Sequence, residues 1–348
     1  MFRFSLISKN IGIDLGTTNS LVYLDKRGIV VNEPTVVAVN NKTNKILAVG
    51  EDAKRMIGRT PSHISVIRPL INGVISDFEM SQEILRHFLK KMSNKGSFVN
   101  YRKAVVGVPS NLTEVERKSV EDAIIGAGVF EPYLINEPLA AAIGARLPVD
   151  EPTANMIVDI GGGTTEIAII SMAGTVTSKS LKIAGDKLND DITRFIRDEF
   201  KLAIGEPTAE AVKVGIGSAI PIDQKLEMKI HGRDMVSGLP KEIAIKDTQV
   251  RAAIAKSLRA MIDAIREVLE TSPPELAGDI LKRGINLCGG GSLLRGIDQL
   301  ISRDLSVATS IIEDPLTAVV RGTGVVVENL VKYYQMLDNP LKPKEVKL

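Results

Sequence analysis

Two short segments of the chain place the same residue types in the same order. Each has an apolar stretch, an aspartate and a turn rich in glycine and threonine: Ile13-Asp14-Leu15-Gly16-Thr17-Thr18-Asn19-Ser20 and Val158-Asp159-Ile160-Gly161-Gly162-Gly163-Thr164-Thr165. Such a turn presents backbone N–H groups and hydroxyls around one concavity that suits an anion. The aspartate at its edge would repel a bare phosphate, so the arrangement makes most chemical sense with Mg²⁺ between them. We therefore expect Asp14 and Asp159 to bracket a metal–polyphosphate complex.

A third glycine-rich turn adds to this pair. It reads Leu287-Cys288-Gly289-Gly290-Gly291-Ser292, follows an apolar strand pattern and leads into a helical one. Because glycine has no Cβ, the backbone of such a turn can approach a flat ligand closely. Either aspartate turn alone is as consistent with a structural β-hairpin whose aspartate stabilises the turn, but two matched copies and a third glycine turn favour one shared ligand site.

Two further sets of charged residues each allow two interpretations. Glu137 stands immediately before Pro138, a residue that suits the first turn of a helix. An ionised carboxylate at a helix N-terminus could hold a water for attack on a terminal phosphate, or it could simply cap the helix. Glu210 and Lys213 share one helical face, where they could bind ribose hydroxyls or form a solvated ion pair.

The elements that position these residues alternate between β and α patterns, which indicates α/β layers. A capping box at Thr113 and Glu116 marks one helix start. The repeated turns predict a duplicated domain whose halves face each other. The expected elements are β-rich stretches at 10–50 and 155–184, strands at 103–108 and 132–135, helices at 80–92, 113–127, 186–201, 208–219 and 248–271, a helix from Pro138, and a β insertion at 222–246.

Composition removes several other classes of protein. A length of 348 residues suggests about two domains, and 44% apolar and 25% charged residues with a net charge of +2 are typical of a globular protein that does not bind nucleic acid. Aromatic residues make up only 4%, too few for stacking platforms. One cysteine and three scattered histidines exclude disulfides, zinc clusters and histidine-based triads, and favour a cytoplasmic protein. No apolar run approaches a membrane span, and the N-terminus lacks a signal-peptide core.

Taken together, the aspartate turns, the segment 136–144 and the glycines at 289–291 resemble the nucleotide signatures of the actin, Hsp70 and sugar-kinase superfamily. Within it, the segments 49–61, 68–77, 204–210 and 238–241 resemble MreB, the family of bacterial actins that control cell shape. The resemblance runs from about residue 10 to about residue 335 and so covers nearly the whole chain.

The resemblance implies an actin-like, ribonuclease H-like α/β fold of duplicated domains with two smaller inserts and a nucleotide cleft between the halves. The first large subdomain would comprise 1–36, 69–149 and 318–348, with a small insert at 37–68. The second would comprise 150–184 and 247–317, with a small insert at 185–246.

The same resemblance implies that ATP with Mg²⁺ binds in the cleft and is hydrolysed there. It assigns the metal to Asp14 and Asp159, and the attacking water to Glu137 with assistance from Thr164. It assigns the phosphates to Gly16, Thr17, Thr18, Asn19, Gly161, Gly162, Gly163 and Thr164, the adenosine to Glu210, Lys213, Gly289, Gly290, Gly291 and Ser292, and the phosphate–ribose region to Gly185 and Asp186.

The implied partner is a second copy of the chain, because members of the family polymerise head to tail into paired antiparallel protofilaments and bind the inner membrane face. Three features favour an anionic surface: the N-terminal segment with Phe2 and Phe4, the loop around Phe98, and a lysine-rich tail at 341–347. Morphogenesis or motility proteins are further partners that the resemblance implies, and nucleic acid is not.

Three rival functions stay open at this point. The first turn, Thr17-Thr18-Asn19-Ser20, is closer to Hsp70 than to the Thr-Ala-Asn common in MreB, so an Hsp70-like chaperone ATPase is one alternative. No separate peptide-binding domain accompanies it. A metabolic kinase of the same superfamily is the second alternative, and a plasmid-segregation filament is the third.

Overall fold

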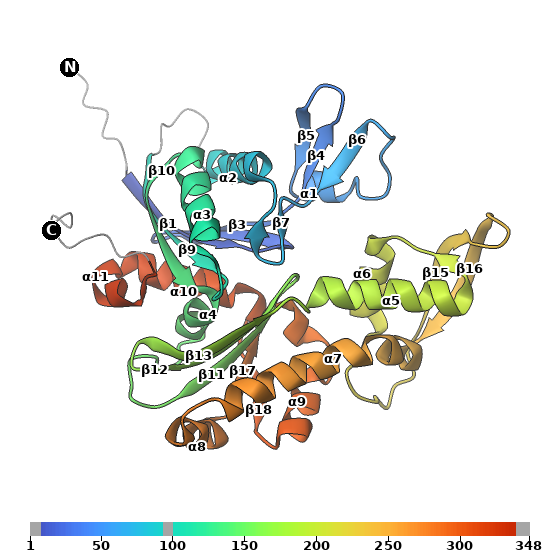
Figure 1. The fold of residues 1–348 in the computed structure, drawn as a ribbon. Helices are drawn as coiled ribbons and strands as arrows, with labels where there is room; N and C mark the ends of the chain where they lie inside the picture. Colours follow the sequence, from blue (N-terminus) through green and yellow to red (C-terminus); the bar gives the residue numbers. More distant parts are fainter. Residues whose placement is uncertain (1–7, 93–99, 339–348) are drawn as a thin grey trace.

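The computed structural model describes residues 8–92 and 100–338, and within them two five-stranded sheets share one topology (Figure 1). The first sheet has the order β10-β9-β1-β2-β3 and the second β13-β12-β11-β17-β18. The strands of the first are β1 (Ser8–Leu15), β2 (Asn19–Leu24), β3 (Gly28–Pro34), β9 (Asn100–Val108) and β10 (Val129–Asn136). Those of the second are β11 (Asn155–Ile160), β12 (Thr165–Ser171), β13 (Gly174–Leu181), β17 (Ile285–Cys288) and β18 (Thr309–Ile311).

The pairing of the strands confirms the duplication that the repeated turns predict. In the first sheet β1, β2 and β3 are antiparallel neighbours, whereas β9 and β10 continue from β1 as parallel strands. The second sheet repeats this pattern, with β11 to β13 antiparallel and β17 and β18 parallel to β11. Each aspartate turn joins the first two strands of its own sheet, so the two turns occupy equivalent places.

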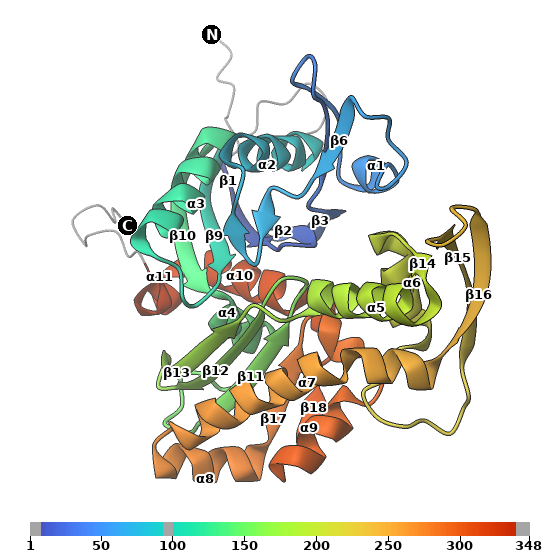
Figure 2. The same ribbon diagram turned by 45° about the vertical axis from the view of Figure 1, so that its right-hand side comes forward.

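Helices cover the outer faces of the sheets and also lie between them (Figures 1 and 2). The first half carries α2 (Phe78–Met92) and α3 (Glu114–Ala127), and the second carries α7 (Asp247–Glu270), α8 (Pro274–Arg283) and α9 (Ile297–Leu305). α4 (Glu137–Gly144) and α10 (Ala318–Glu328) lie between the sheets, and their apolar side chains form one cluster with residues of both sheets. The halves are therefore joined through α4 and α10.

α4 and α10 cross at backbone contact, and this crossing depends on two glycines. A Cβ on Gly144 would lie 2.0 Å from the carbonyl oxygen of Ala318, and one on Gly322 would lie 1.8 Å from that of Ala140. Both distances are far below van der Waals contact, so a larger residue at either position would force the helices apart. The small residues of this helix pair therefore fix the joint between the sheets.

Two small three-stranded sheets extend from the halves, on the right of Figure 1. One contains β4 (Val37–Asn40), β5 (Lys45–Val49) and β6 (Ile64–Ile67) with α1 (Glu51–Lys54). The other contains β14 (Leu202–Ala203), β15 (Glu227–Asp234) and β16 (Pro240–Lys246), close to α5 (Gly185–Phe200) and α6 (Glu206–Ile216). A two-stranded sheet of β7 (Leu70–Ile71) and β8 (Val74–Ile75) follows β6. The small three-stranded sheets lie within the segments expected as inserts, and the subdomain boundaries themselves stay a prediction.

The helix start expected from the capping box is confirmed. Thr113 Oγ1 accepts a hydrogen bond from the Glu116 backbone at 3.3 Å, and the Glu116 carboxylate accepts one from the Thr113 backbone at 2.7 Å. The helix expected at 208–219 lies slightly earlier in the chain: α6 begins at Glu206 and ends at Ile216, because Gly217 adopts extended backbone angles. Among residues 8–92 and 100–338, no helix has the length and apolar character needed to cross a bilayer.

Candidate functional site

A cavity of about 390 Å³ lies where the two aspartate turns and the third glycine turn meet. It draws its wall from both sheets and from α5 and α6. The residues singled out from the sequence that line it are Asp14, Gly16, Thr17, Thr18, Asn19, Glu137, Asp159, Gly161, Gly162, Gly163, Thr164, Gly185, Asp186, Glu210, Lys213, Gly289, Gly290 and Gly291. The structure thus brings together residues from six separate segments of the chain, and their chemical roles remain predictions.

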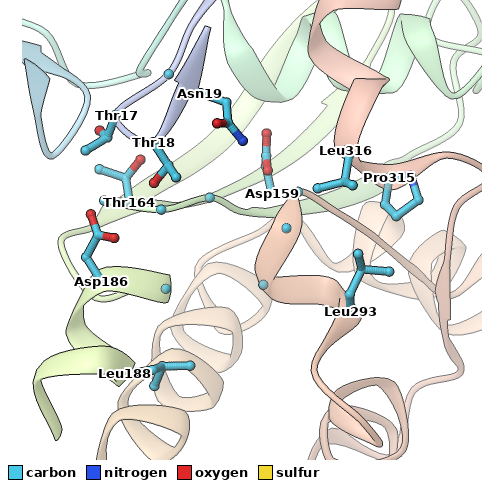
Figure 3. A pocket seen from close by; sticks show the side chains of 18 of the residues that line it. Thr17, Thr18, Asn19, Asp159, Thr164, Asp186, Leu188, Leu293, Pro315 and Leu316 are labelled. Carbon is cyan, nitrogen blue, oxygen red and sulfur yellow. The ribbon is translucent and has the colours of Figure 1, made fainter. Parts of the chain in front are cut away.

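The first two turns approach each other closely across the cavity. A Cβ on Gly162 would lie 1.8 Å from Thr18 Oγ1, and a Cβ on Gly163 would lie 2.8 Å from Thr17 Oγ1. Figure 3 shows Thr17 and Thr18 on the same side of the cavity as Thr164. Thr18 Oγ1 is buried without a hydrogen-bond partner in the described part of the chain. Buried polar atoms are normally satisfied, so this hydroxyl is available to a bound ligand.

Four carboxyl groups gather beside these turns; Glu137, Asp159 and Glu166 are buried, and Asp14 is partly buried. Burial is the main cause that raises the pKa of Asp14 to about 7, with the charge of Asp159 adding to it. Burial and then Glu166 raise the pKa of Asp159 to about 7 as well. For Glu137, burial first and then the charges of Glu166 and the two aspartates raise the pKa well above its ordinary value. The group as a whole therefore has an excess of negative charge when ionised.

This excess negative charge fits a divalent cation. The described residues contain no cluster of three or more His, Cys, Asp or Glu side chains arranged to hold a metal by themselves. Mg²⁺ does not require such a cage, because it keeps several waters and commonly binds through one or two carboxylates plus the phosphates of a ligand. Asp14 and Asp159, with the hydroxyl-rich turns beside them, supply a donor set of that kind.

Glu166 is a cavity residue that the sequence reasoning did not single out. It lies opposite Asp159 in the β11–β12 pair, so both side chains leave the same face of the sheet. Its carboxylate accepts hydrogen bonds from Ser180 Oγ and from the backbone of Ser110, the latter at 3.3 Å. Because Ser110 follows β9, Glu166 connects the two halves. Its place directly after Thr165 in the second turn motif was a signal that could have marked it.

Glu210 and Lys213 form an ion pair, as one interpretation of the sequence predicted, but the pair is not fully solvated. Lys213 Nζ lies 2.7 Å from Glu210 Oε2 and donates to the Gly185 carbonyl at 3.0 Å, and its side chain is only 14% exposed. Asn189 Nδ2 also donates to Glu210 at 2.6 Å. Burial acts to raise the pKa of Glu210, but Lys213 and Asn189 outweigh it and hold this pKa below its usual range.

Ser292 is the predicted site residue that does not line the cavity. Its hydroxyl is buried and donates to the Gly289 carbonyl at 2.7 Å, so it stabilises the turn. Gly289 has a φ of 76°, and a Cβ there would lie 2.2 Å from Asp159 Oδ1. Only glycine therefore fits at this point of the third turn.

The apolar part of the cavity wall was also missed, because no motif marks it. Its members come from α5, α6, the third turn, the segment before α10 and the first turn of α10; they include Leu188, Val214, Leu293, Leu294, Pro315, Leu316 and Val319. In the view of Figure 3, Leu293, Pro315 and Leu316 lie away from Asp186 and the threonines. Leu293 and Leu316 are each about half exposed, at 53% and 52%. An apolar wall beside a polar turn suits a ligand with a flat ring and a charged end.

Comparison with solved structures defines the class of protein. MreB5 of Spiroplasma citri, solved bound to ADP and to AMPPNP, superimposes with a TM-score of 0.90 in both cases, at 39% and 40% sequence identity. The match covers 94% of this chain and 99% and 98% of those chains. The fold is therefore actin-like, with mixed sheets and helices in duplicated halves.

The chain belongs to the MreB/Mbl family, whose model, described as MreB/Mbl protein, matches residues 8–335. It is 46% identical to the cell shape-determining protein Mbl of Bacillus subtilis over 327 residues, which are 94% of this chain and 98% of that protein. It is 43% identical to the cell shape-determining protein MreB of Escherichia coli K12 over 327 residues, 93% and 94% of the two chains. The family resemblance that the motifs indicated is confirmed.

Proposed function

We propose that the chain binds ATP with Mg²⁺ in this cavity, hydrolyses the terminal phosphate, and uses the nucleotide state to control its own assembly into filaments that act in cell shape or motility. The observation that carries the proposal is the meeting of two equivalent glycine–threonine turns, one from each sheet, around a buried carboxyl cluster. The relatives named as bound to ADP and AMPPNP support the nucleotide part of the proposal.

Each part of the cavity takes one portion of the ligand in this proposal. The turns at 16–19 and 161–164 bind the phosphates, and Gly185 and Asp186 lie where the phosphates meet the ribose. The third glycine turn, with Glu210, Lys213 and the apolar wall, holds the adenosine. Asp14 and Asp159 hold Mg²⁺, which supplies positive charge that offsets the repulsion among the carboxylates.

Glu137 orients the attacking water, assisted by the Thr164 hydroxyl. It begins α4 with its carboxyl inside the cavity, and it is only 9% exposed. Positioned general bases contribute about 10²- to 10⁴-fold to reaction rates. Burial favours the neutral acid, so Glu137 depends on positive charge nearby and on the helix N-terminus to act in its ionised form.

Self-assembly head to tail and into antiparallel double protofilaments is the proposed output. Nucleotide can control assembly only if it binds one conformation more tightly than another, and a ligand held by both halves has that property. The turn between β15 and β16 carries exposed apolar side chains, with Met235, Val236 and Leu239 at 54%, 85% and 65% exposure. Exposed apolar groups that gather on one turn are typical of association surfaces.

The proposed location is the cytoplasm, with filaments attached to the inner face of the membrane. The three sequence features that favour an anionic lipid surface, around Phe2, Phe98 and the lysine-rich tail, lie outside the described residues. Morphogenesis or motility proteins remain proposed partners.

Pelleting of the purified protein with Mg-ATP, Mg-ADP or no nucleotide tests the proposal, together with phosphate release by Glu137→Gln. We expect more pellet, with filaments in negative stain, in Mg-ATP. The variant should bind nucleotide like the wild type but hydrolyse about 10²- to 10⁴-fold more slowly. Glu114→Gln, at the exposed start of α3, is the matched control. Equal pelleting in all three states would refute nucleotide control, and normal turnover by Glu137→Gln would refute the assigned chemistry.

A further inference from the structure

The C-terminal end of the described chain packs against the junction between β10 and α4. After α10 the chain forms α11 (Leu330–Tyr333) and a 3₁₀ turn (Tyr334–Met336). Both ribbon views place this end of the chain next to α4 and β10 (Figures 1 and 2). Tyr333, Met336 and Leu337 are buried in the same apolar cluster as Ile135 and Leu139. The last residues therefore touch the element that carries Glu137.

Asp338 ends this segment and makes two bonds to that junction and a third to α3. Its backbone N–H donates to the Leu134 carbonyl at 2.9 Å. Its carboxylate accepts from Asn136 Nδ2 at 3.1 Å and from Arg117 Nη1 at 2.6 Å. Asp338 and Arg117 are only 16% and 22% exposed, so the pair is shielded from solvent. One residue thus connects the C-terminal segment to β10 and to α3.

The side chain of Asn136 contacts Asp338 and does not cap its own helix. Asn136 is the N-cap residue of α4, where an asparagine side chain usually accepts a hydrogen bond from the first turn of the helix. Here the side chain makes no capping bond, and its amide nitrogen donates to Asp338 instead. The missing capping bond destabilises α4 less than usual, because Pro138 in its first turn has no backbone N–H that needs a partner. The Asn136 side chain is therefore oriented by Asp338 and not by its own helix.

Glu137, the next residue, is fixed on its other sides by packing. The far end of α4 crosses α10 at backbone contact, and Glu137 Cγ lies close enough to Gly107 that an added Cβ there would be 3.4 Å away. The peptide between Asn136 and Glu137 sets where the carboxylate lies in the cavity. A rotation of that peptide moves the carboxylate directly, and the Asn136 contact to Asp338 opposes such a rotation.

We propose that Asp338 is a positioning residue for Glu137, so that the C-terminal segment of the chain sets the rate of hydrolysis. This inference rests on the function proposed above. Loss of the bond to Asn136 frees the junction without removing any group from the cavity. Misplacement of a catalytic group by about 1 Å can cost about a hundredfold in rate, and a loosened junction spends part of its time correctly placed. We therefore expect the single-turnover hydrolysis rate to fall about tenfold, which is half of that hundredfold loss on a logarithmic scale.

The experiment compares Asp338→Asn and Asp338→Ala with the wild type in the full chain. Single-turnover phosphate release, nucleotide affinity and the thermal midpoint are measured for each. Asp304→Ala is the matched control, because Asp304 is 15% exposed, pairs with Arg259 at 3.0 Å and does not line the cavity. We expect slower hydrolysis with unchanged nucleotide affinity in the Asp338 variants, and an unchanged hydrolysis rate in the control. A fall in the thermal midpoint with an unchanged hydrolysis rate would overturn the proposal.

A charge exchange separates positioning from stability. Asn136→Asp alone places two carboxylates against each other and should slow hydrolysis more than Asp338→Ala. The double variant Asn136→Asp/Asp338→Asn restores an amide–carboxylate pair and should recover most of the rate, and absence of recovery would refute the proposal. Failure of the proposed function is recognised separately: Glu137→Gln would then hydrolyse normally. If Glu137→Gln is inactive but both Asp338 variants are normal, only the positioning role is wrong.

Discussion

An ion pair beside the cavity connects the segment after β6 with α6, and its reversal should speed nucleotide release. Arg68 follows β6 in the first half, and its guanidinium donates to the carboxylate of Glu206, the first residue of α6. One turn further along, the same helix presents Glu210 to the cavity. Figure 2 shows α6 on the side of the molecule that faces the sheet of β4 to β6. Separation of α6 from the segment after β6 must therefore break this pair.

The size of the effect follows from the exposure of the two side chains. Arg68 is 26% exposed and Glu206 is 44% exposed, so solvent screens the pair and its contribution is at most about 1 kcal/mol. Arg68→Gln should then speed release by up to about fivefold. Arg68→Glu replaces the attraction to Glu206 by repulsion. The new carboxylate would also lie near Asp186, whose pKa is raised by burial although the charge of Arg68 acts to lower it. A doubled effect of about 2 kcal/mol corresponds to about 30-fold faster release.

The assay is displacement of a fluorescent nucleotide by excess unlabelled nucleotide in a stopped-flow instrument, at low and high salt. The control is Lys179→Glu, which reverses a pair with Glu267 of comparable exposure inside the second half. The double variant Arg68→Glu/Glu206→Arg restores opposite charges and should return release towards the wild-type rate. Unchanged release in Arg68→Glu, or a double variant that releases as fast as the single one, would refute the reasoning.

Three further predictions concern other parts of the molecule. Gly289→Ala should weaken nucleotide binding, because its φ of 76° and a Cβ 2.2 Å from Asp159 Oδ1 force the third turn to move; titration calorimetry measures this, and unchanged affinity would count against it. Val236→Glu should raise the critical concentration for pelleting without altering nucleotide affinity, because the 85%-exposed valine lies on the apolar β15–β16 turn; equal pelleting would exclude that turn from assembly. Thr113→Ala should cost about 1 kcal/mol in urea unfolding at pH 7. The Thr113 hydrogen bonds hold the pKa of Glu116 below its ordinary value, so the stability they contribute is complete above the unfolded-state pKa and is lost as the pH falls through the folded-state pKa. The difference between wild type and variant should therefore shrink in acid, and a constant difference would contradict the assignment.

The parts of the site that the sequence could predict are those with local signals. The aspartate turns that contain Thr17 and Gly162 are recognisable because such a tight turn needs glycine and hydroxyl residues within a few positions. This requirement does not depend on the rest of the chain. The capping box at Thr113 is local in the same sense and is confirmed. The duplicated topology then followed from the repetition of one local pattern, and the strand pairing confirms it.

The parts that could not be predicted depend on contacts between residues far apart in the sequence. Leu188 and Leu316 are ordinary leucines, and only the fold makes them part of one cavity wall. Ser292 belongs to a recognisable motif, yet its hydroxyl turns back to Gly289 and away from the cavity. The contact between Asn136 and Asp338 spans 202 positions, so no pattern near either residue indicates it. Burial and direction are properties of the folded chain, and residue type alone does not determine them.

In the function proposed above, a chemical change in the cavity must reach distant surfaces through the joint between the halves. α4 and α10 pack at backbone contact between the sheets, so we expect this joint to resist compression and any movement of the halves to be a rotation about it. The Arg68–Glu206 pair lies away from that joint, where a small rotation produces a large displacement. Glu137 and Asp338 lie beside the joint itself, at the start of α4. A rotation that breaks the ion pair would therefore also strain the β10–α4 junction. We expect the difference in pelleting between Mg-ATP and Mg-ADP to change together with nucleotide release in Arg68→Glu, and together with the hydrolysis rate in Asp338→Ala.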